Sequence, residues 1–288
     1  MVHRLSTKMK LHTINTGFFK LDGGAMFGVV PKSIWNKTNP ADENNLCTWA
    51  MRCLLIEDGN RLILVDTGIG NKQDEKFFSH YYLHGDATMD SSLAAKGFHR
   101  DDITDVFLTH LHFDHVGGAV IRQDEQLLPA FKNATYWSNR QHWDWAVHPN
   151  EREKASFFKE NILPIQESGQ LKFIPVEAGV HFTDDIHIRF VYGHTDAMML
   201  PLINYKGKQI LYMADLLPSV GHIPIPYIMA YDMFPLKTLG EKKTILNEAV
   251  ENQYILYFEH DPVNECCTLQ QTEKGVRVKD TFKLDELR

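Results

Sequence analysis

The segment THLHFDH, residues 109–115, places three histidines and one aspartate within seven positions, directly after the apolar run DVFL. His110, His112, Asp114 and His115 gain nothing from a hydrophobic core, and crowding them is tolerable when a cation occupies the space between them. The chain has 15 histidines in 288 residues, and at that frequency this spacing should arise by chance roughly 0.003 times in such a chain. The segment therefore predicts a metal site rather than a solvated polar loop.

Other expected strands also end in residues that can bind a metal. The apolar runs in question end at Asp66, His110, His194, Asp215 and His260. Such residues gather at one rim of a layered α/β protein, where the loops build the site. We therefore expect these five side chains to lie close together.

The local signals predict alternating short strands and helices. Hairpins are expected over residues 53–68, turning at Asp58-Gly59, and over residues 200–215, turning at Lys206-Gly207. Helices are expected over residues 91–98, 134–148 and 236–252. No long polar tract resembles a linker, which favours a single domain over residues 1–288.

The rim supplies more ligands than one tetrahedral zinc needs. His110 and His112 can reach one ion, whereas Asp114 and His115 point to a neighbouring position. Adding His194 to the first set and His260 to the second, with the Asp215 carboxylate bridging, gives two ions that keep room for water. We expect two Zn²⁺ per chain, with other divalent metals as alternatives. The predicted metal ligands are His110, His112, Asp114, His115, His194, Asp215 and His260.

THLHFDH, together with GHT at 193–195, AD at 214–215, HD at 260–261 and VDTG at 65–68, resembles the metallo-β-lactamase superfamily over nearly the whole chain. The resemblance implies an α/β fold, the four-layer αββα sandwich, with a binuclear metal site at one edge of the two sheets. It also implies a hydrolase in which Asp66 braces the ligand loops. Within the superfamily, HLHFDHVGG is most similar to N-acyl-homoserine lactonases, which open the lactone of quorum-sensing signals. Organophosphate triester hydrolases are similar in the same motif.

Two departures from the lactonase pattern concern the substrate. The lactonases carry a tyrosine a few residues after the bridging aspartate, whereas this chain has Pro218 there. His222, or a tyrosine of PYIMAYD (226–232) such as Tyr231, could supply the missing hydrogen bond. The usual Pro-Gly-His continuation of GHT is also replaced, by DAMML.

The mechanism that we expect from this resemblance needs no nucleophilic side chain. A hydroxide bridging the two metals attacks the lactone carbonyl, because the metals lower the pKa of bound water to about 7. Asp215 holds both metals, Asp114 carries a proton to the departing alkoxide, and His222 contacts the substrate. An acyl chain also needs an apolar groove. The candidate groove residues, which could equally pack the loops, are Met26, Phe27, Trp35, Ile225 and Tyr231.

The composition limits the classes of partner that this protein is expected to bind. With 30 Lys+Arg against 37 Asp+Glu, the formal charge of -7 offers no footprint for nucleic acid. No stretch approaches a signal peptide or a membrane span, so we expect a soluble cytoplasmic protein. Four cysteines without a CxxC pair predict reduced structural thiols. The expected partner is a small acyl lactone, and a homodimer is one candidate assembly.

The sequence favours three other interpretations of the motif less strongly. A thioester hydrolase of the glyoxalase type normally adds a basic helical C-terminal region, and the tail TEKGVRVKDTFKLDELR looks too short for one. A di-iron oxygen-reducing enzyme usually has Glu where His112 stands. A non-catalytic zinc-stabilised module would not need the complete ligand set with open coordination.

Overall fold

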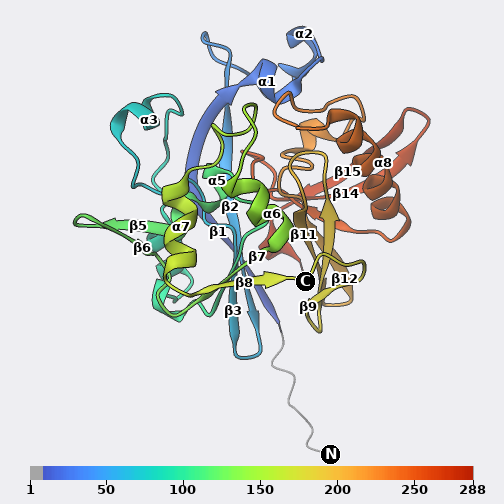
Figure 1. The fold of residues 1–288 in the computed structure, drawn as a ribbon. Coiled ribbons are helices and arrows are strands. Elements are labelled where there is room, and N and C mark those ends of the chain that lie inside the picture. The colour runs from blue at the N-terminus through green and yellow to red at the C-terminus, as the bar shows by residue number, and fades with distance from the viewer. Residues whose placement is uncertain (1–8, 288) are drawn as a thin grey trace, which may run out of the picture.

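The strands in the computed structural model form two β-sheets that pack face to face (Figure 1). The structure describes residues 9–287, and positions 1–8 and 288 of the expected domain lie outside the described residues. The first sheet has the order β1 (Lys10–Asp22), β2 (Leu46–Asp58), β3 (Arg61–Val65), β4 (Asp105–Phe107), β7 (Thr135–Asn139) and β8 (Leu171–Ile174). The second has the order β15 (Gly275–Phe282), β14 (Cys266–Thr272), β13 (Ile255–Tyr257), β12 (Lys208–Tyr212), β11 (Met198–Tyr205), β10 (Ile186–Val191) and β9 (His181–Thr183). A separate hairpin pairs β5 (Val120–Gln123) with β6 (Gln126–Pro129).

Helices cover the outer faces of the two sheets, and further short helices lie at one edge of the sandwich (Figure 1). They are α1 (Gly23–Phe27), α2 (Lys32–Trp35), α3 (Glu75–Ser79), α4 (Met89–Ala95), α5 (Phe113–Val116), α6 (Arg140–Val147), α7 (Lys159–Glu167) and α8 (Pro235–Glu251). Short 3₁₀ turns occur at Arg100–Asp102, Gly117–Ala119, Val220–His222 and Leu284–Glu286. Among residues 9–287, no helix is long and apolar enough to cross a membrane.

The hydrophobic core forms on both faces of the strands, because their side chains are apolar on both faces. In β2, Leu54 and Ile56 pack between the sheets, whereas Cys53 and Leu55 join the cluster under α4, α6 and α7. This alternation is the two-residue period of a strand, and a strand covered on both faces has a continuous apolar sequence. Helix α8 covers the second sheet with Ile245, Leu246 and Ala249. The four-layer αββα sandwich expected from the sequence is therefore confirmed.

Most of the local predictions are confirmed. Antiparallel pairing joins β2 to β3 up to Asp58 and Arg61, and β11 to β12 up to Tyr205 and Lys208. The helices expected over residues 91–98 and 236–252 correspond to α4 and α8, and α4 begins two residues earlier than expected because Thr88 caps it. All four cysteines are buried and free.

The helix expected over residues 134–148 is wrong for its first part. Residues Thr135–Asn139 form β7, and only Arg140–Val147 form a helix, α6. The run Thr-Tyr-Trp is typical of strands, and β7 completes parallel pairing with β4. Asn139 then starts the helix, because its side chain accepts a hydrogen bond from the His142 N–H.

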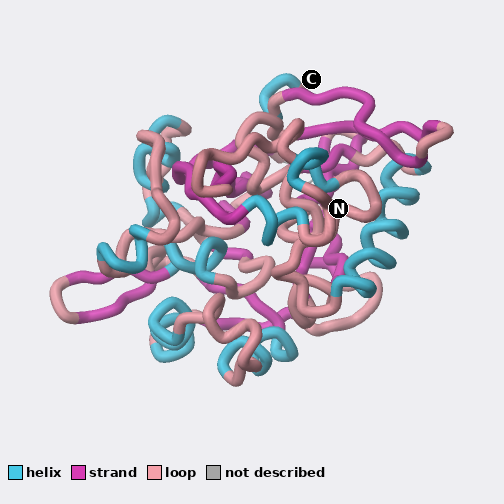
Figure 2. The backbone as a smooth tube through the Cα atoms, turned by 90° about the horizontal axis from the view of Figure 1, so that it is seen from above, coloured by secondary structure: helices cyan, strands magenta, loops and turns pink. Residues whose placement is uncertain are grey.

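Parallel strand pairs bring the ends of distant segments to one edge. β3 pairs in parallel with β4 in the first sheet, and β12 pairs in parallel with β13 in the second. The segments that follow these strands therefore leave the sandwich at the same edge. In the view onto this edge, loops cross between the strands (Figure 2). Two residues here, Asp66 (φ 58°) and Ala214 (φ 41°), adopt the left-handed backbone region that side chains other than glycine rarely enter.

A proline-rich loop, residues 223–232, closes one side of this edge and is tied down by α8. Lys242 of α8 is fully buried, and its Nζ donates to the carbonyl oxygens of Pro224 (2.8 Å), Tyr227 (3.0 Å) and Ile225 (3.4 Å). A buried ammonium group is tolerated when its hydrogen bonds are satisfied. Lys242 therefore fixes the loop against the second sheet.

Replacing this lysine should destabilise the protein. In Lys242→Met the three carbonyl groups lose their donor, and we expect the free energy of unfolding to fall by about 2 kcal/mol, because unsatisfied buried acceptors are costly. Denaturant unfolding followed by circular dichroism measures the change. The exposed neighbour Lys243→Met on the same helix is the matched control; equal stability of the two variants would contradict the role of Lys242.

Candidate metal centre

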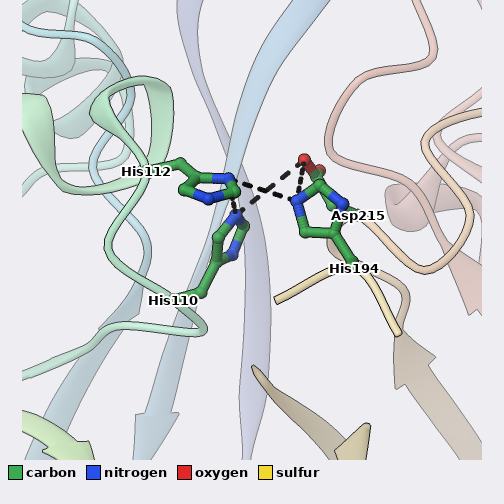
Figure 3. Close-up of side chains that lie close together, drawn as sticks. All are labelled: His110, His112, His194 and Asp215. Carbon is green, nitrogen blue, oxygen red and sulfur yellow. Dashed lines mark hydrogen bonds and ion pairs between the residues drawn. The ribbon is translucent and has the colours of Figure 1, made fainter. Parts of the chain in front are cut away.

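Four predicted ligands from three segments converge on one point (Figure 3). His110 and His112 follow β4, His194 follows β10 and Asp215 follows β12. His112 Nδ1 lies 3.1 Å from His110 Nε2 and 3.2 Å from His194 Nε2. Asp215 Oδ2 lies 3.2 Å from His194 Nε2 and 3.8 Å from His110 Nε2. These atoms form the first subsite.

The remaining predicted ligands form a second subsite next to the first. His115 Nε2 and His260 Nε2 lie 3.1 Å apart. Asp114 Oδ2 lies 3.8 Å from the former and 3.7 Å from the latter. Asp215 Oδ1 lies 3.3 Å from His115 Nε2 and 3.0 Å from His260 Nε2. One carboxylate oxygen of Asp215 thus faces each subsite.

The donor set fits two divalent cations. All seven residues are at most 7 % exposed, and imidazole nitrogen and carboxylate oxygen are among the ligands that zinc takes in proteins. Asp215 Oδ1 is buried and makes no hydrogen bond with any group in the described chain, although His260 Nε2 lies 3.0 Å away. A bound cation would satisfy this oxygen.

The outward-facing nitrogen of each ligand ring has its own partner. The outer nitrogen of His110 contacts Thr109 Oγ1 (3.0 Å), and that of His112 contacts Glu153 Oε1 (2.9 Å). The outer nitrogen of His194 contacts Asp232 Oδ1 (2.8 Å), and that of His260 contacts the Ala50 carbonyl oxygen (2.8 Å). A hydrogen bond from this N–H leaves the lone pair of the other nitrogen directed at the subsite. The surrounding fold therefore fixes both tautomer and ring orientation.

The fifth ring, His115, faces two buried carboxyl groups. Its Nδ1 is hydrogen-bonded to Asp66 Oδ2 at 3.2 Å and lies 3.0 Å from Glu259 Oε2. Asp66 also accepts hydrogen bonds from the Thr109 N–H (2.8 Å) and hydroxyl (2.6 Å). Asp66 thereby braces the loop that carries His110 and His112.

Charge interactions between the ligands shift their pKa values strongly. Burial lowers the pKa of His194 and of His260, but the Asp215 carboxylate outweighs burial and raises these pKa values to about 10 and about 9. Burial raises the pKa of Asp215, but His115, His260 and His194 hold it well below its usual value. Burial raises the pKa of Glu259 to about 8, against the opposing effect of His115. Without a cation, the centre keeps its charges balanced by holding protons.

Five of the predicted ligands, His112, Asp114, His194, Asp215 and His260, line a narrow pocket of about 60 Å³. The rest of its lining is mostly apolar and consists of Phe19, Leu21, Met26, Trp49, Phe113, Ser156, Met229 and Tyr231. A larger hollow of about 650 Å³ lies elsewhere, between α8 and the C-terminal hairpin, and none of the predicted ligands lines it. The pocket over the metal subsites is therefore the candidate active site.

The predicted substrate residues divide into two groups. Met26 and Tyr231 line the pocket. Phe27 and Trp35 lie behind its wall, fully buried and stacked on each other with ring centroids 5.2 Å apart. Ile225 packs against the core between the sheets.

His222 is not at the pocket surface, although we expected it to contact the substrate. Its Nε2 lies 2.9 Å from the Met26 carbonyl oxygen and its Nδ1 lies 2.9 Å from Ser219 Oγ. The ring stacks on Phe27 at 4.5 Å, and burial lowers its pKa to about 3. Both nitrogens are engaged, so the geometry gives His222 the task of holding the backbone of Met26.

Several residues of the centre were missed by sequence reasoning. They are the carboxyl groups behind the ligand rings, Glu153, Asp232 and Glu259, and the wall residues Phe19, Trp49 and Phe113. Only Glu259 had a usable signal, since it is an acidic residue in an apolar strand directly before the ligand His260. Glu153 and Asp232 lie in segments without a local pattern, and no local signal marks Phe19, Trp49 or Phe113 as a pocket residue.

Comparison with known proteins agrees with this geometry. Residues 52–260 match the model of the metallo-β-lactamase superfamily. An N-acyl homoserine lactonase from Bacillus cereus is 25% identical over 285 residues, which cover 94% of this chain and 98% of the relative. A probable metal-dependent hydrolase from Staphylococcus aureus superposes with a TM-score of 0.86 at 27% identity, covering 97% of this chain and 98% of that one.

A further crystal structure shares the fold at lower identity. AidC, a dizinc quorum-quenching lactonase in complex with a product, superposes with a TM-score of 0.77 at 21% identity, and 97% of each chain is covered. The matched family segment runs from within β2 to the last predicted ligand, His260. This protein therefore belongs to the metallo-β-lactamase superfamily and is a metal-dependent hydrolase.

Proposed function

We propose that this protein is a binuclear zinc hydrolase that opens the lactone ring of N-acyl-homoserine lactones. The observation that carries the proposal is the position of Asp215, whose two carboxylate oxygens face two complete histidine subsites. Relatives named as N-acyl homoserine lactonases support the substrate class. We place the reaction in the cytoplasm, as the sequence led us to expect.

The seven ligands would divide between two ions. His110, His112, His194 and Asp215 would hold one, and Asp114, His115, His260 and Asp215 the other. When bound, such ions supply water of lowered pKa and polarise a carbonyl group. The carboxylate of Asp215 fixes the spacing of the subsites, and the apolar walls keep bulk water from them.

Asp114 is the proposed proton carrier. It lines the pocket, it is 7 % exposed, and its Oδ2 lies 3.7 Å from His260 Nε2. The Asp114 carboxyl group therefore lies next to both the second subsite and the pocket in which the substrate would bind. Asp114 can thus accept a proton from the water that adds to the lactone carbonyl and deliver it to the alkoxide oxygen released when the ring opens.

Tyr231 is the proposed replacement for the missing lactonase tyrosine. It lines the pocket but is 38 % exposed, so its ring is partly covered while a substrate can still approach it. It reaches the pocket from the proline-rich loop, and not from the segment after Asp215 where Pro218 stands. A phenolic hydroxyl here can hydrogen-bond a substrate carbonyl.

The acyl chain would lie against the apolar wall. The apolar residues that line the pocket beside the ligands are Phe19, Leu21, Met26, Trp49, Phe113 and Met229. Ligand pockets typically combine such a wall with a few polar groups that fix orientation. This combination favours an acyl lactone over a fully polar substrate.

The reaction is tested by direct comparison of substrates. With about two zinc ions per chain, we expect the protein to open a long-chain N-acyl-homoserine lactone with kcat/KM above about 10⁴ M⁻¹ s⁻¹, followed by pH-stat. A phosphotriester and a thioester assayed alongside should react far more slowly. Faster turnover of the triester or thioester by fully loaded protein would replace the proposed substrate with that class.

Metal uptake should release protons. Metal-free His194 and His260, with pKa values of about 10 and about 9, carry protons at pH 7.5, whereas a ligating imidazole is neutral. Against the effect of burial, Glu259 and Asp215 also raise the pKa of His115. We therefore expect release of at least about two protons per chain, so that zinc affinity rises between pH 7 and pH 9. Titration calorimetry in buffers of different ionisation enthalpy measures the release. His148→Ala, at an exposed histidine, should behave as wild type, and proton-neutral uptake by wild type would contradict the charge balance described above.

Removing the Tyr231 hydroxyl should weaken catalysis without affecting metal binding. For Tyr231→Phe we expect kcat/KM for the lactone to fall about 3- to 10-fold, which corresponds to the loss of one hydrogen bond. Tyr227→Phe, the other tyrosine of the same loop, should stay within about twofold of wild type. Equal effects of the two substitutions, or none, would exclude Tyr231 as the replacement tyrosine.

A further inference from the structure

Glu259 is a buried carboxyl group that the proposed mechanism does not use. It follows β13, directly before the ligand His260, and is 0 % exposed. Its backbone carbonyl accepts a hydrogen bond from the Arg52 N–H of β2 at 3.0 Å, which fixes its position. Within residues 9–287, neither side-chain oxygen of Glu259 has a hydrogen-bond partner. Burying such a group is unfavourable unless a charge nearby compensates for it.

Among residues 9–287, the compensating group in contact with this carboxyl is a ligand ring. Glu259 Oε2 lies 3.0 Å from His115 Nδ1, closer than Asp66 Oδ2 at 3.2 Å. Asp66 is already satisfied by the N–H and hydroxyl of Thr109, whereas Glu259 has only the ring. Among the five ligand rings of the described chain, His115 alone has two carboxyl groups against its outer nitrogen.

The two subsites therefore differ in what lies behind them. In the first subsite, Glu153 and Asp232 each contact a different ring, His112 and His194. In the second, two carboxyl groups act on the same ring, and His260 is held by a neutral backbone carbonyl. Carboxyl groups behind a ligand increase its basicity and orient it, and their loss typically weakens metal binding 10- to 100-fold.

We propose that Glu259 is a positioning residue for the second metal subsite, where it orients His115 and strengthens binding of the ion held with Asp114 and His260. This inference rests on the proposed binuclear centre. Glu259 would thus strengthen metal binding at the second subsite, and Glu153, behind His112, would do the same at the first.

The test is a titration of metal-free protein with Co²⁺, followed by its visible absorption spectrum. In Glu259→Gln the side chain keeps its size, and we expect the second subsite to bind Co²⁺ 10- to 100-fold more weakly with the first unchanged. In Glu153→Gln we expect the opposite pattern. Asp114→Asn, which alters a ligand of the second subsite only, identifies which spectral step belongs to that subsite. Metal-free Glu259→Gln should unfold no more easily than wild type, because a neutral amide of the same size replaces a buried carboxyl group.

Several outcomes would overturn the inference. One is a Glu259→Gln variant whose affinity for Co²⁺ is unchanged at both subsites, and another is equal weakening of both. A third is a wild-type protein that binds a third equivalent of Co²⁺ which Glu259→Gln loses, because Glu259 would then be a ligand. If Glu259→Gln does not fold, Glu259→Asp retracts the carboxyl group from His115, and the same selective weakening is expected. Wild-type protein that takes up fewer than two equivalents would overturn the binuclear centre as well, whereas normal uptake with an unaffected variant would overturn only the role of Glu259.

Discussion

The mutual compensation between the Asp215 carboxylate and the histidines on either side of it is the interaction on which the site depends. Five imidazoles and two aspartates are almost completely buried at one edge of the sandwich, and such a set is stable only if charge is balanced locally. Without metal, the balance comes from protons held on His194 and His260 next to Asp215. Cations can take over this task because the same atoms converge on two points. The site is thus arranged to exchange protons for metal.

The sandwich provides the positions, and contacts from distant segments provide the orientations. Parallel pairing of β3 with β4 and of β12 with β13 brings the ligand segments to a common edge. The ring orientations come from residues far along the chain, such as Glu153 for His112 and the Ala50 carbonyl for His260. A change in any of these segments would therefore disturb a ligand without touching a metal.

The fold and the convergence of the candidate metal ligands could be predicted from the sequence because their signals are local. Alternating apolar runs, turn residues and the spacing of His110, His112, Asp114 and His115 all lie within short windows. The carboxyl groups behind the rings could not be predicted, since Glu153 and Asp232 reach the centre only through tertiary packing. The same limit explains the segment 134–148, where pairing with β4 selected a strand, and His222, whose neighbour Met26 lies far away in the chain.

The proline-rich loop joins the substrate side of the pocket to the first metal subsite. It carries Met229 and Tyr231 on the pocket wall, and the next residue, Asp232, holds His194. The N–H of Met233 in turn donates to the His194 carbonyl, and Lys242 fixes the start of the loop. A substitution that moves Tyr231 would thus also move the partner of a metal ligand. The segment around Met26 is coupled to the same loop, because the Ala230 N–H donates to the Ala25 carbonyl oxygen at 2.8 Å and His222 Nε2 lies 2.9 Å from the Met26 carbonyl oxygen. Under the proposed function, a change of substrate preference in either segment would therefore also affect the first subsite.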